Sequence, residues 1–423
     1  MDLIVKKVLF VTYYWPPSGK ASLHWPIRMI QHLPGFGWQP CVLTAAEDTF
    51  SQKDESLVSA VNPSLHVFKV RSFEPFSLYR SFLGKKEDEP LVASETISRS
   101  DRGMRHRLAI WIRMNLFVPD ARIGWYWNAV RQGRKALQRE NIDCVVSIGP
   151  PHTSLLVGKK IAKVLGVPHV PVFIDPWVDI AYYRGFKRSG LTSALDRRLE
   201  RSVLQQSGSV VFVTRSMKED YGARYPFLRD KSHVLYWGYD EDAFRNFDSA
   251  SERDAEVVLH AGNIFDFQNP KPFWKILRSE IDRGRKLRIV FVGTVSPGVR
   301  QSIEEAGLKQ ATSYKGFLTY DEMIRELGKA SYLLVCASEK RHVPGKLFEY
   351  LRAGKPIIAF GDDNREIEGM LKDSDAGILL RYQYSGTDIF QRLEALHPNS
   401  TACKQYDRKV VAGELGRILG SLS

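Results

Sequence analysis

Residues 143–175 read DCVVSIGPPHTSLLVGKKIAKVLGVPHVPVFID, and this stretch decides the fold class. It begins with an apolar run over 143–149 and ends with a second apolar run over 169–175. The segment between them, 154–166, has apolar residues at the spacing of an amphipathic helix. A strand, a helix and a second strand in this order form a βαβ unit, whose strands are parallel. The stretch therefore predicts an α/β fold built on an open parallel sheet.

The same alternation of strands and helices extends over the whole chain and restarts once. In the first half, further strands are expected over 6–14, 40–44, 66–70, 209–214 and 233–238, and further helices over 22–34, 127–142 and 192–207. In the second half, strands are expected over 256–262, 288–294, 311–317, 332–338, 356–361 and 376–380. We interpret the polar, acidic segment 239–256 as an interdomain linker. Two facing sheets of this kind bind ligands in the cleft between them, beyond the carboxyl ends of the strands.

The composition is that of a soluble globular protein, with 43% hydrophobic and 26% charged residues. No run of about 18 apolar residues occurs, so no segment is expected to span a membrane. The first apolar run leads into WPPSGK (15–20) rather than into a signal-peptide cleavage site. The cysteines are far apart and form no metal-binding pattern, so we expect free buried thiols at Cys41, Cys144, Cys336 and Cys403.

The positive charge is concentrated in the first half of the chain. Residues 1–240 carry 34 Lys and Arg against 22 Asp and Glu, whereas residues 241–423 carry 27 against 26. This asymmetry indicates an anionic partner for the first half, such as a membrane surface, a lipid phosphate or nucleic acid, or else a basic face that only confers solubility. Motifs of nucleic-acid-binding domains are absent, so nucleic acid is not expected as a partner.

The segment 72–107 has no clear strand or helix period. In it and just after it, arginines stand among aromatic and aliphatic residues, namely Arg99, Arg102, Arg105, Arg107, Arg113, Trp111, Leu116 and Phe117. Basic residues interleaved with aromatic ones suit a membrane interface. A surface insertion without a role fits the pattern equally well.

Three loops of the first half carry candidate site residues. The loop VTYYWPPSGKAS (11–22), with Gly19, joins a strand to a helix and predicts an anion or sugar site, or a plain turn. His152 lies at the start of a helix that follows the strand 143–149. This position suits either a histidine that contacts a ligand or a structural histidine. Asp175 ends a strand beside Trp177, which suits hydrogen bonding of sugar hydroxyls, although a carboxylate there also caps turns.

A fourth constellation lies in the second half, where residues 338–361 read SEKRHVPGKLFEYLRAGKPIIAFG. Gly345 permits a close backbone approach, Lys346 adds a cation, and the helix N-terminus favours a phosphate. Glu349 lies one turn further on, where a carboxylate accepts hydrogen bonds from ribose hydroxyls. The alternative is an amphipathic helix with a solvent-exposed Glu349. Motifs of zinc proteases and serine hydrolases are absent, and no metal-binding Asp-x-Asp directly follows a strand.

In this order, the four constellations resemble the retaining glycosyltransferases of family 4, which have the GT-B fold, and the bacterial surface-polysaccharide branch most closely. The segments that carry the resemblance are 8–44, 115–130, 147–177 and 345–357. The resemblance implies two Rossmann-like domains with open parallel sheets facing a cleft, an acceptor-binding domain over 1–240 and a nucleotide-sugar-binding domain over 241–405. It also implies a C-terminal helix over 406–423 that crosses back to the first domain.

The resemblance also assigns roles to individual residues. Glu349 matches the second of two glutamates spaced eight apart in the family, whereas the first position holds Arg341. Asn263 stands where an arginine is common, Lys271 is the nearest cation, and Ile174 replaces the histidine that usually precedes the position of Asp175. The implied catalytic residues are Asp175 and His152, and the implied donor-binding residues are Gly19, Gly262, Asn263, Gly345, Lys346, Leu347 and Glu349.

The resemblance thus implies a metal-independent retaining glycosyltransferase without a cofactor, of hexosyltransferase type. It would move a sugar from a nucleotide diphosphate sugar to a glycan or lipid-linked acceptor in cell-surface polysaccharide biosynthesis. We expect a cytoplasmic protein, peripheral on the anionic inner face of the plasma membrane. The alternatives are a catalytically inactive GT-B binding or scaffold subunit, which would explain Arg341 and Asn263, and a GT-B nucleotide-sugar epimerase, which needs no acceptor.

Overall fold

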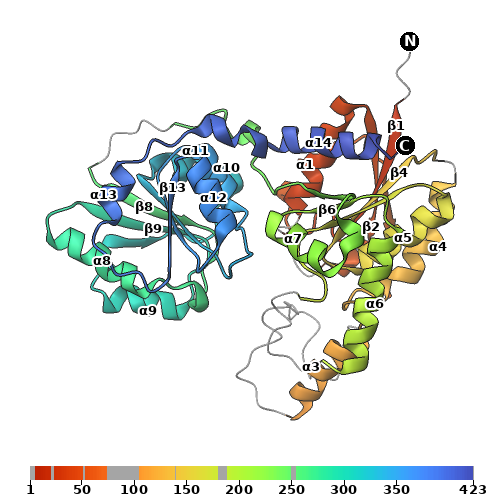
Figure 1. Ribbon diagram of the computed structural model, residues 1–423, viewed down its shortest axis with the longest axis horizontal. Helices are drawn as coiled ribbons and strands as arrows, with labels where there is room; N and C mark the ends of the chain where they lie inside the picture. The colour runs from red at the N-terminus through yellow and green to blue at the C-terminus, as the bar shows by residue number, and fades with distance from the viewer. Residues whose placement is uncertain are drawn as a thin grey trace. The chain divides into compact units, whose positions relative to one another are not determined.

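The computed structural model describes residues 5–20, 23–50, 53–73, 104–138, 140–179, 188–248 and 254–422. The chain divides into two compact units, of which the first comprises residues 1–236 and 412–423 and the second residues 237–411. Each unit contains one parallel sheet with helices on both faces (Figure 1).

The first sheet has the strand order β3-β2-β1-β4-β5-β6-β7, and all its pairings are parallel. The order reverses direction between β1 and β4, which makes the carboxyl ends of these strands the place where open sheets bind ligands. The strands are β1 Lys6–Val11, β2 Trp38–Ala45, β3 Val67–Val70, β4 Cys144–Gly149, β5 His169–Phe173, β6 Val210–Phe212 and β7 Ser232–Val234.

Helices cover both faces of this sheet because each connection between parallel strands must cross over it. Its apolar strands pack against them in two buried clusters, one of which includes Trp125 and the other Trp177. The helices are α1 His24–His32, α3 Met104–Leu116, α4 Trp125–Leu137, α5 Thr153–Leu165, α6 Gly190–Gln206 and α7 Arg215–Arg224. The helix α14 Arg408–Gly420 adds its last residues to this unit, where Trp38 Nε1 donates a 3.2 Å hydrogen bond to the Gly416 carbonyl.

The second sheet has the strand order β10-β9-β8-β11-β12-β13 and is also parallel throughout. Its switch point lies between β8 and β11. The strands are β8 Glu256–Ala261, β9 Leu287–Val292, β10 Thr312–Tyr314, β11 Tyr332–Cys336, β12 Ile357–Phe360 and β13 Gly377–Leu380. The helices are α8 Lys271–Asp282, α9 Pro297–Glu305, α10 Tyr320–Lys329, α11 Lys346–Ala353, α12 Arg365–Asp373 and α13 Ile389–Glu394.

The prediction that residues 239–256 form an interdomain linker is wrong for those of them that the structure describes. The break between the units falls after Tyr236, and the residues up to 248 pack within the second unit. Tyr239 and Phe244 are 1% and 4% exposed, and Glu241 forms an ion pair with Arg352 of α11. Glu241 thus pairs with α11, whereas Asp242 pairs with Arg245 inside the segment, and two of the three aromatic side chains are buried.

Several other expectations meet the structure directly. All four cysteines are buried and free, as expected. Within the described residues, no helix is long and apolar enough to cross a membrane. Arg99 and Arg102 lie outside the described residues, and so do the side chains of Arg105 and Arg107.

Candidate functional site

Two loops at the carboxyl edge of the second sheet lie against each other near its switch point. Gly262 follows β8 and Gly293 follows β9, and each has a φ of +102°, a left-handed conformation that favours glycine. A Cβ atom on Gly293 would lie 2.8 Å from the backbone of Gly262. Asn263 joins the same loops, because its Oδ1 accepts a 3.1 Å hydrogen bond from the amide of Thr294. These contacts fix both loops beside α11.

Lys346, the first residue of α11, directs its ammonium group at Gly262. Its Nζ lies 3.0 Å from His260 Nε2, and a Cβ atom on Gly262 would lie only 2.8 Å from Nζ. Burial lowers the pKa of Lys346 to about 8, although the negative charge of Glu349 partly opposes this. Among the residues that the structure describes, no carboxylate lies within ion-pair distance of this ammonium. A cation without such a partner favours an anionic ligand.

The N-terminus of α11 faces the same place. Gly345 occupies its N-cap position without a side-chain cap, and the amides of Leu347 and Phe348 donate to the backbone carbonyls of Pro344 and Gly345. The indole of Trp237 packs on Gly345, where a Cβ atom would lie 3.0 Å from Trp237 Cδ1. A helix N-terminus and the Lys346 ammonium together form a site with the electrostatics that phosphate groups prefer.

Glu349 lies one turn into α11 and is buried, with 4% exposure. Its Oε1 accepts a 3.0 Å hydrogen bond from the Tyr320 hydroxyl and pairs at 3.3 Å with Arg408, which is itself only 2% exposed. Burial raises the pKa of Glu349, and the positive charge of Arg408 opposes that shift. The carboxylate therefore faces α10 and the start of α14.

In the first unit, His152 and Asp175 meet at the carboxyl ends of β4 and β5. His152 is 1% exposed, and its ring is stacked on the indole of Trp177 with 5.0 Å between the ring centroids. Burial lowers the pKa of His152 to about 3, although a hydrogen bond with the backbone of Asp175 opposes the shift, so the imidazole is neutral. The side chain of Asp175 is exposed, so the carboxyl group is accessible and the histidine is enclosed.

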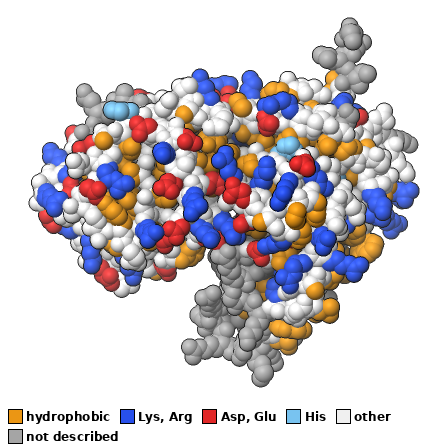
Figure 2. Space-filling model, viewed as in Figure 1, with side chains coloured by type: hydrophobic (Ala, Val, Ile, Leu, Met, Phe, Trp, Pro, Cys, Tyr) orange, Lys and Arg blue, Asp and Glu red, His pale blue; other side chains and the backbone are white. Residues whose placement is uncertain are grey.

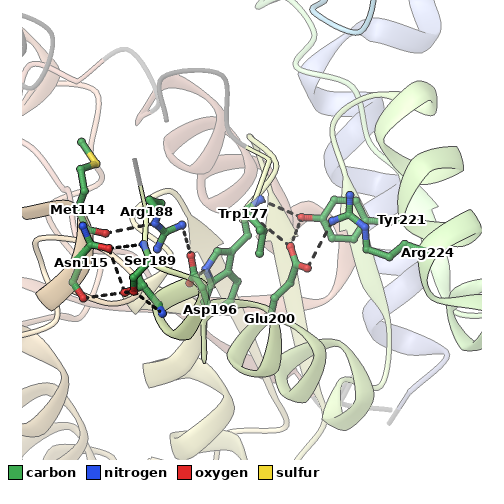
Figure 3. Close-up of polar contacts among 11 residues, drawn as sticks. Met114, Asn115, Trp177, Arg188, Ser189, Asp196, Glu200, Tyr221 and Arg224 are labelled. Carbon is green, nitrogen blue, oxygen red and sulfur yellow. Dashed lines mark hydrogen bonds and ion pairs between the residues drawn. The ribbon is translucent and has the colours of Figure 1, made fainter. Parts of the chain in front are cut away.

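Two buried carboxylates of α6 hold Trp177 in this position (Figure 3). Trp177 Nε1 donates a 2.6 Å hydrogen bond to Asp196, which also pairs with Arg188 at 2.8 Å. The backbone amide of Trp177 donates to the Tyr221 hydroxyl, which in turn donates to Glu200 at 2.6 Å. Burial raises the pKa of Asp196 and of Glu200. The network fixes the segment that directly follows Asp175.

The loop after β1 carries a cationic surface around Tyr14. Lys20 Nζ and the Arg122 guanidinium lie 5.7 Å and 5.9 Å from the centroid of the Tyr14 ring, within the range of cation–π attraction. Gly19 packs near Asp54, where a Cβ atom would lie 3.5 Å from Asp54 Cβ.

Two family models together cover most of the chain. Residues 82–243 match the model for Glycosyltransferase Family 4, and residues 255–397 match the model for Glycosyl transferases group 1. The chain belongs to the family 4 glycosyltransferases. Among curated proteins, none matches its sequence.

The solved structures similar to this glycosyltransferase share its GT-B fold. HepE of Anabaena, solved with UDP and glucose, is 14% identical, with 99% of this chain and 100% of that chain covered and a TM-score of 0.63. The lipopolysaccharide outer core galactosyltransferase WaaB is 14% identical, with 98% and 99% covered and a TM-score of 0.59. A putative UDP-N-acetylglucosamine 2-epimerase from Listeria monocytogenes is 12% identical, with 97% and 94% covered and a TM-score of 0.51.

The structure of the glycosyltransferase sorts the predicted site residues into two groups. Gly19, His152 and Asp175 belong to the first unit, and the structure joins His152 to Asp175 but not to Gly19. The other predicted residues belong to the second unit. There Gly262 and Lys346 are in contact, with Asn263 next to Gly262 in the same loop.

Three details differ from expectation. The solvent-exposed alternative for Glu349 is wrong, because Tyr320 and Arg408 cover the carboxylate. The side chain of Leu347 is fully buried in the core, and its amide donates to the Pro344 carbonyl. Sequence reasoning also missed His260. A polar residue inside an apolar strand was the available signal for His260, since EVVLHA otherwise has the pattern of a buried strand.

Proposed function

We propose that this glycosyltransferase moves a sugar from a nucleotide diphosphate sugar to a glycan or lipid-linked acceptor, with retention at the anomeric carbon. The observation that carries the proposal is the Lys346 ammonium, which lies against Gly262 at the N-terminus of α11. The diphosphate of a nucleotide sugar supplies the anion that this place favours. HepE, which has the same fold, binds UDP and UDP-glucose, and this supports a nucleotide sugar as the donor.

The same groups suit the chemistry of the transfer. When the bond between the sugar and the diphosphate breaks, negative charge develops on the leaving phosphate, and preorganised donors stabilise it. Lys346, the N-terminus of α11 and the loop of Gly262 and Asn263 are our candidates for this role, without a metal ion. The leaving phosphate itself accepts the proton of the acceptor hydroxyl in this proposal, so no side chain acts as a nucleophile.

The remaining predicted residues receive roles on this basis. Glu349 binds the ribose through the oxygen that is not engaged by Tyr320 and Arg408. Asp175 binds the acceptor, because its carboxyl group is exposed at the carboxyl end of β5. His152 positions Asp175 rather than exchanging protons with the acceptor, because it is enclosed and neutral.

We further propose that the acceptor belongs to cell-surface polysaccharide biosynthesis and is reached at the cytoplasmic membrane surface. The net positive charge of the first unit supports this, and so does the shared fold with a lipopolysaccharide galactosyltransferase. An anionic leaflet attracts a basic protein reversibly without a spanning segment.

Ligand-induced thermal shifts with UDP-, GDP- and dTDP-sugars, followed by transfer and hydrolysis assays, test the proposal. A nucleotide sugar at 100 times its Kd stabilises the folded state by about 2.7 kcal/mol. Lys346→Met is expected to abolish the shift, whereas Lys340→Met, at an exposed position in the loop that precedes α11, is expected to keep it. Binding without turnover would favour a scaffold subunit, and interconversion of free nucleotide sugars would favour an epimerase. The absence of any shift would refute the proposed donor class.

A further inference from the structure

His260 is a buried histidine in the middle of the second sheet, with 1% exposure. Its Nδ1 lies 2.9 Å from the carbonyl oxygen of Leu334 on the neighbouring strand β11. A carbonyl oxygen only accepts hydrogen bonds, so Nδ1 carries the proton. In the neutral ring the other nitrogen, Nε2, then has a lone pair, which faces Lys346 Nζ at 3.0 Å, while the Asn263 carbonyl oxygen lies further from Nε2, at 3.5 Å. The sheet thus fixes both the orientation and the tautomer of the imidazole.

The ammonium of Lys346 has an unusual environment for a cation. Burial keeps the imidazole of His260 neutral, because the pKa of His260 lies well below its ordinary value. His342, on the loop before α11, also has a lowered pKa, and burial raises the pKa of the Cys336 thiol on β11 to about 12. The remaining charged group is Glu349 of α11 itself, whose carboxylate already pairs with Arg408.

The Lys346 ammonium occupies the place where Gly262 lacks a side chain. A Cβ atom at this position would lie 2.8 Å from Lys346 Nζ and 3.0 Å from Lys346 Cε, so any other residue would displace the lysine. Lys346 is half-buried, whereas its partner His260 is enclosed. The ammonium therefore has one neutral partner on the side of the sheet and a glycine backbone beside it.

We propose that His260 is a positioning residue that holds the Lys346 ammonium against Gly262, and that binding of a nucleoside diphosphate there draws a proton into the site. The inference rests on the proposed function for the identity of the anion. His260 donates to Leu334 and accepts from Lys346, so it orients the cation without contributing charge of its own. The bound diphosphate supplies the missing counter-charge, which favours the protonated form of Lys346.

The sign of the pH dependence follows from this environment. Since the pKa of Lys346 is about 8 in the free protein, the amine is charged at pH 6.5 and mostly neutral at pH 9. If the diphosphate binds only to the charged form of Lys346, its binding makes Lys346 take up a proton at pH 9 but not at pH 6.5. Affinity is thus expected to fall as the pH rises through 8.

The first experiment needs no ligand. The side-chain Cε signals of the lysines are titrated by NMR, with the Lys346 signal assigned by its absence in Lys346→Met. His260→Phe removes the acceptor and is expected to lower the pKa of Lys346, whereas His260→Gln retains an acceptor and is expected to preserve it. His342→Gln is the matched control, since His342 hydrogen-bonds to Ser338 instead. An unchanged pKa in a folded His260→Phe variant would overturn the positioning role.

The second experiment measures proton uptake. UDP, GDP and dTDP are titrated into the wild-type protein by calorimetry at pH 6.5 and pH 9, in buffers that differ in ionisation enthalpy. We expect uptake at pH 9 only, and a Kd about tenfold higher for His260→Phe than for His260→Gln at pH 9. Nucleotide binding without uptake at pH 9 would overturn the coupling and leave the proposed function intact. If no nucleotide binds, the proposed function and the coupling both fail, and the lysine titration still decides the role of His260.

Discussion

A lysine whose hydrogen-bond partner is a neutral imidazole reduces the stability of the folded chain. The pKa of Lys346 falls from 10.5 to about 8 on folding, mainly because of burial. The folded protein therefore binds this proton more weakly than the unfolded chain does, and the destabilisation is complete below pH 8 and disappears above pH 10.5. A bound ligand that supplies the counter-charge would explain why a destabilising lysine stands here, since binding sites often keep groups that lower stability.

Lys346→Met is accordingly expected to stabilise the protein while it weakens donor binding. One pKa unit corresponds to about 1.4 kcal/mol, so a shift from 10.5 to about 8 corresponds to about 3.5 kcal/mol. Because Lys346 is only half-buried and solvent screens its charge, we expect a smaller gain of about 2 kcal/mol in the free energy of unfolding at pH 7. Urea denaturation at pH 7 and pH 10 measures the gain, which should shrink at the higher pH. A destabilised variant at pH 7 would mean that Lys346 is a structural residue.

Glu349 combines a binding role with a structural one, and two variants separate them. Glu349→Ala is expected to weaken donor binding by about 1.5–3 kcal/mol, the worth of hydrogen bonds to a charged group. It should also lower stability by about 3 kcal/mol, because the buried Arg408 loses the carboxylate with which it pairs and keeps only its hydrogen bond to the Trp237 carbonyl. Tyr320→Phe removes only one hydrogen bond to the same oxygen and should leave the donor Kd nearly unchanged. An unchanged Kd in folded Glu349→Ala would remove this residue from the donor site.

The pattern around Glu349 also shows what a sequence reveals about single residues. Its place one turn into a helix that opens with Pro-Gly-Lys was readable, because neighbours along a helix are fixed by its period. Arg408 is 59 positions away in the chain, and nothing local indicates that it pairs with Glu349. His260 was missed for the same reason, since its partner Lys346 lies 86 positions further on.

At the scale of elements, α6 shows how carboxylates one turn apart support a loop. Asp196 and Glu200 point to the same side of the helix and receive hydrogen bonds from Trp177 and Tyr221 (Figure 3). The sequence predicted this helix from its period, but charged residues usually mark a solvated face. Only the structure shows that these two carboxylates are buried.

Asp196→Ala is expected to destabilise the first unit by about 3 kcal/mol, because Arg188 loses its buried partner. The loop that follows Asp175 should then shift, so the transfer rate falls while donor affinity is preserved, as we also expect for Asp175→Asn. Denaturation, kcat and donor Kd measure these effects. A parallel loss of donor affinity would contradict the separate roles of the two units.

The strands were predictable because buried parallel strands are short apolar runs between turns. Each of the expected runs is a strand in the structure. The helix α7 was not expected, since its sequence RSMKEDYGAR is polar apart from Met217 and Tyr221, which one turn of spacing brings to the core. The segment 239–248 was mistaken for a linker for a similar reason, because its two buried aromatic residues lie among many charged ones.

For the whole molecule, the net charge lies on one unit. The first unit, residues 1–236 and 412–423, carries 35 Lys and Arg against 22 Asp and Glu, whereas residues 237–411 carry 26 of each. Within the first unit, α3 and the start of α6 are joined, because Asn115 accepts a hydrogen bond from the Ser189 amide. Large apolar side chains are exposed on these two helices, namely Leu108, Trp111, Leu116, Leu191 and Leu195.

Exposed arginines accompany these apolar side chains. Arg197, Arg198 and Arg201 of α6 are exposed, and Figure 2 shows basic and hydrophobic side chains gathered over α3 and α6. We infer that this surface, defined by the five apolar residues and these three arginines, docks on an anionic bilayer. Apolar side chains enter the interface while basic residues contribute about 1 kcal/mol each near anionic lipid.

Vesicle co-sedimentation tests this docking. Binding is expected to be strong at low salt with anionic lipid and weak with neutral lipid or at about 0.5 M salt, because salt screens charges over about 8–10 Å. Arg197→Glu combined with Arg198→Glu should reduce binding at least tenfold, since each reversal removes one attraction and adds one repulsion. Charge reversal at Arg102 and Arg105 should have a similar effect.

The matched control is the double variant Arg288→Glu and Arg325→Glu, which changes two exposed arginines of the neutral unit. It should sediment like the wild type, because net charge alone does not bring a protein to a membrane when the basic residues lie away from the docking surface. Neither double variant should alter nucleotide affinity. Equal binding to neutral and anionic vesicles would contradict an electrostatic origin. No binding to either would assign the basic residues to solubility and favour an acceptor that is free in solution.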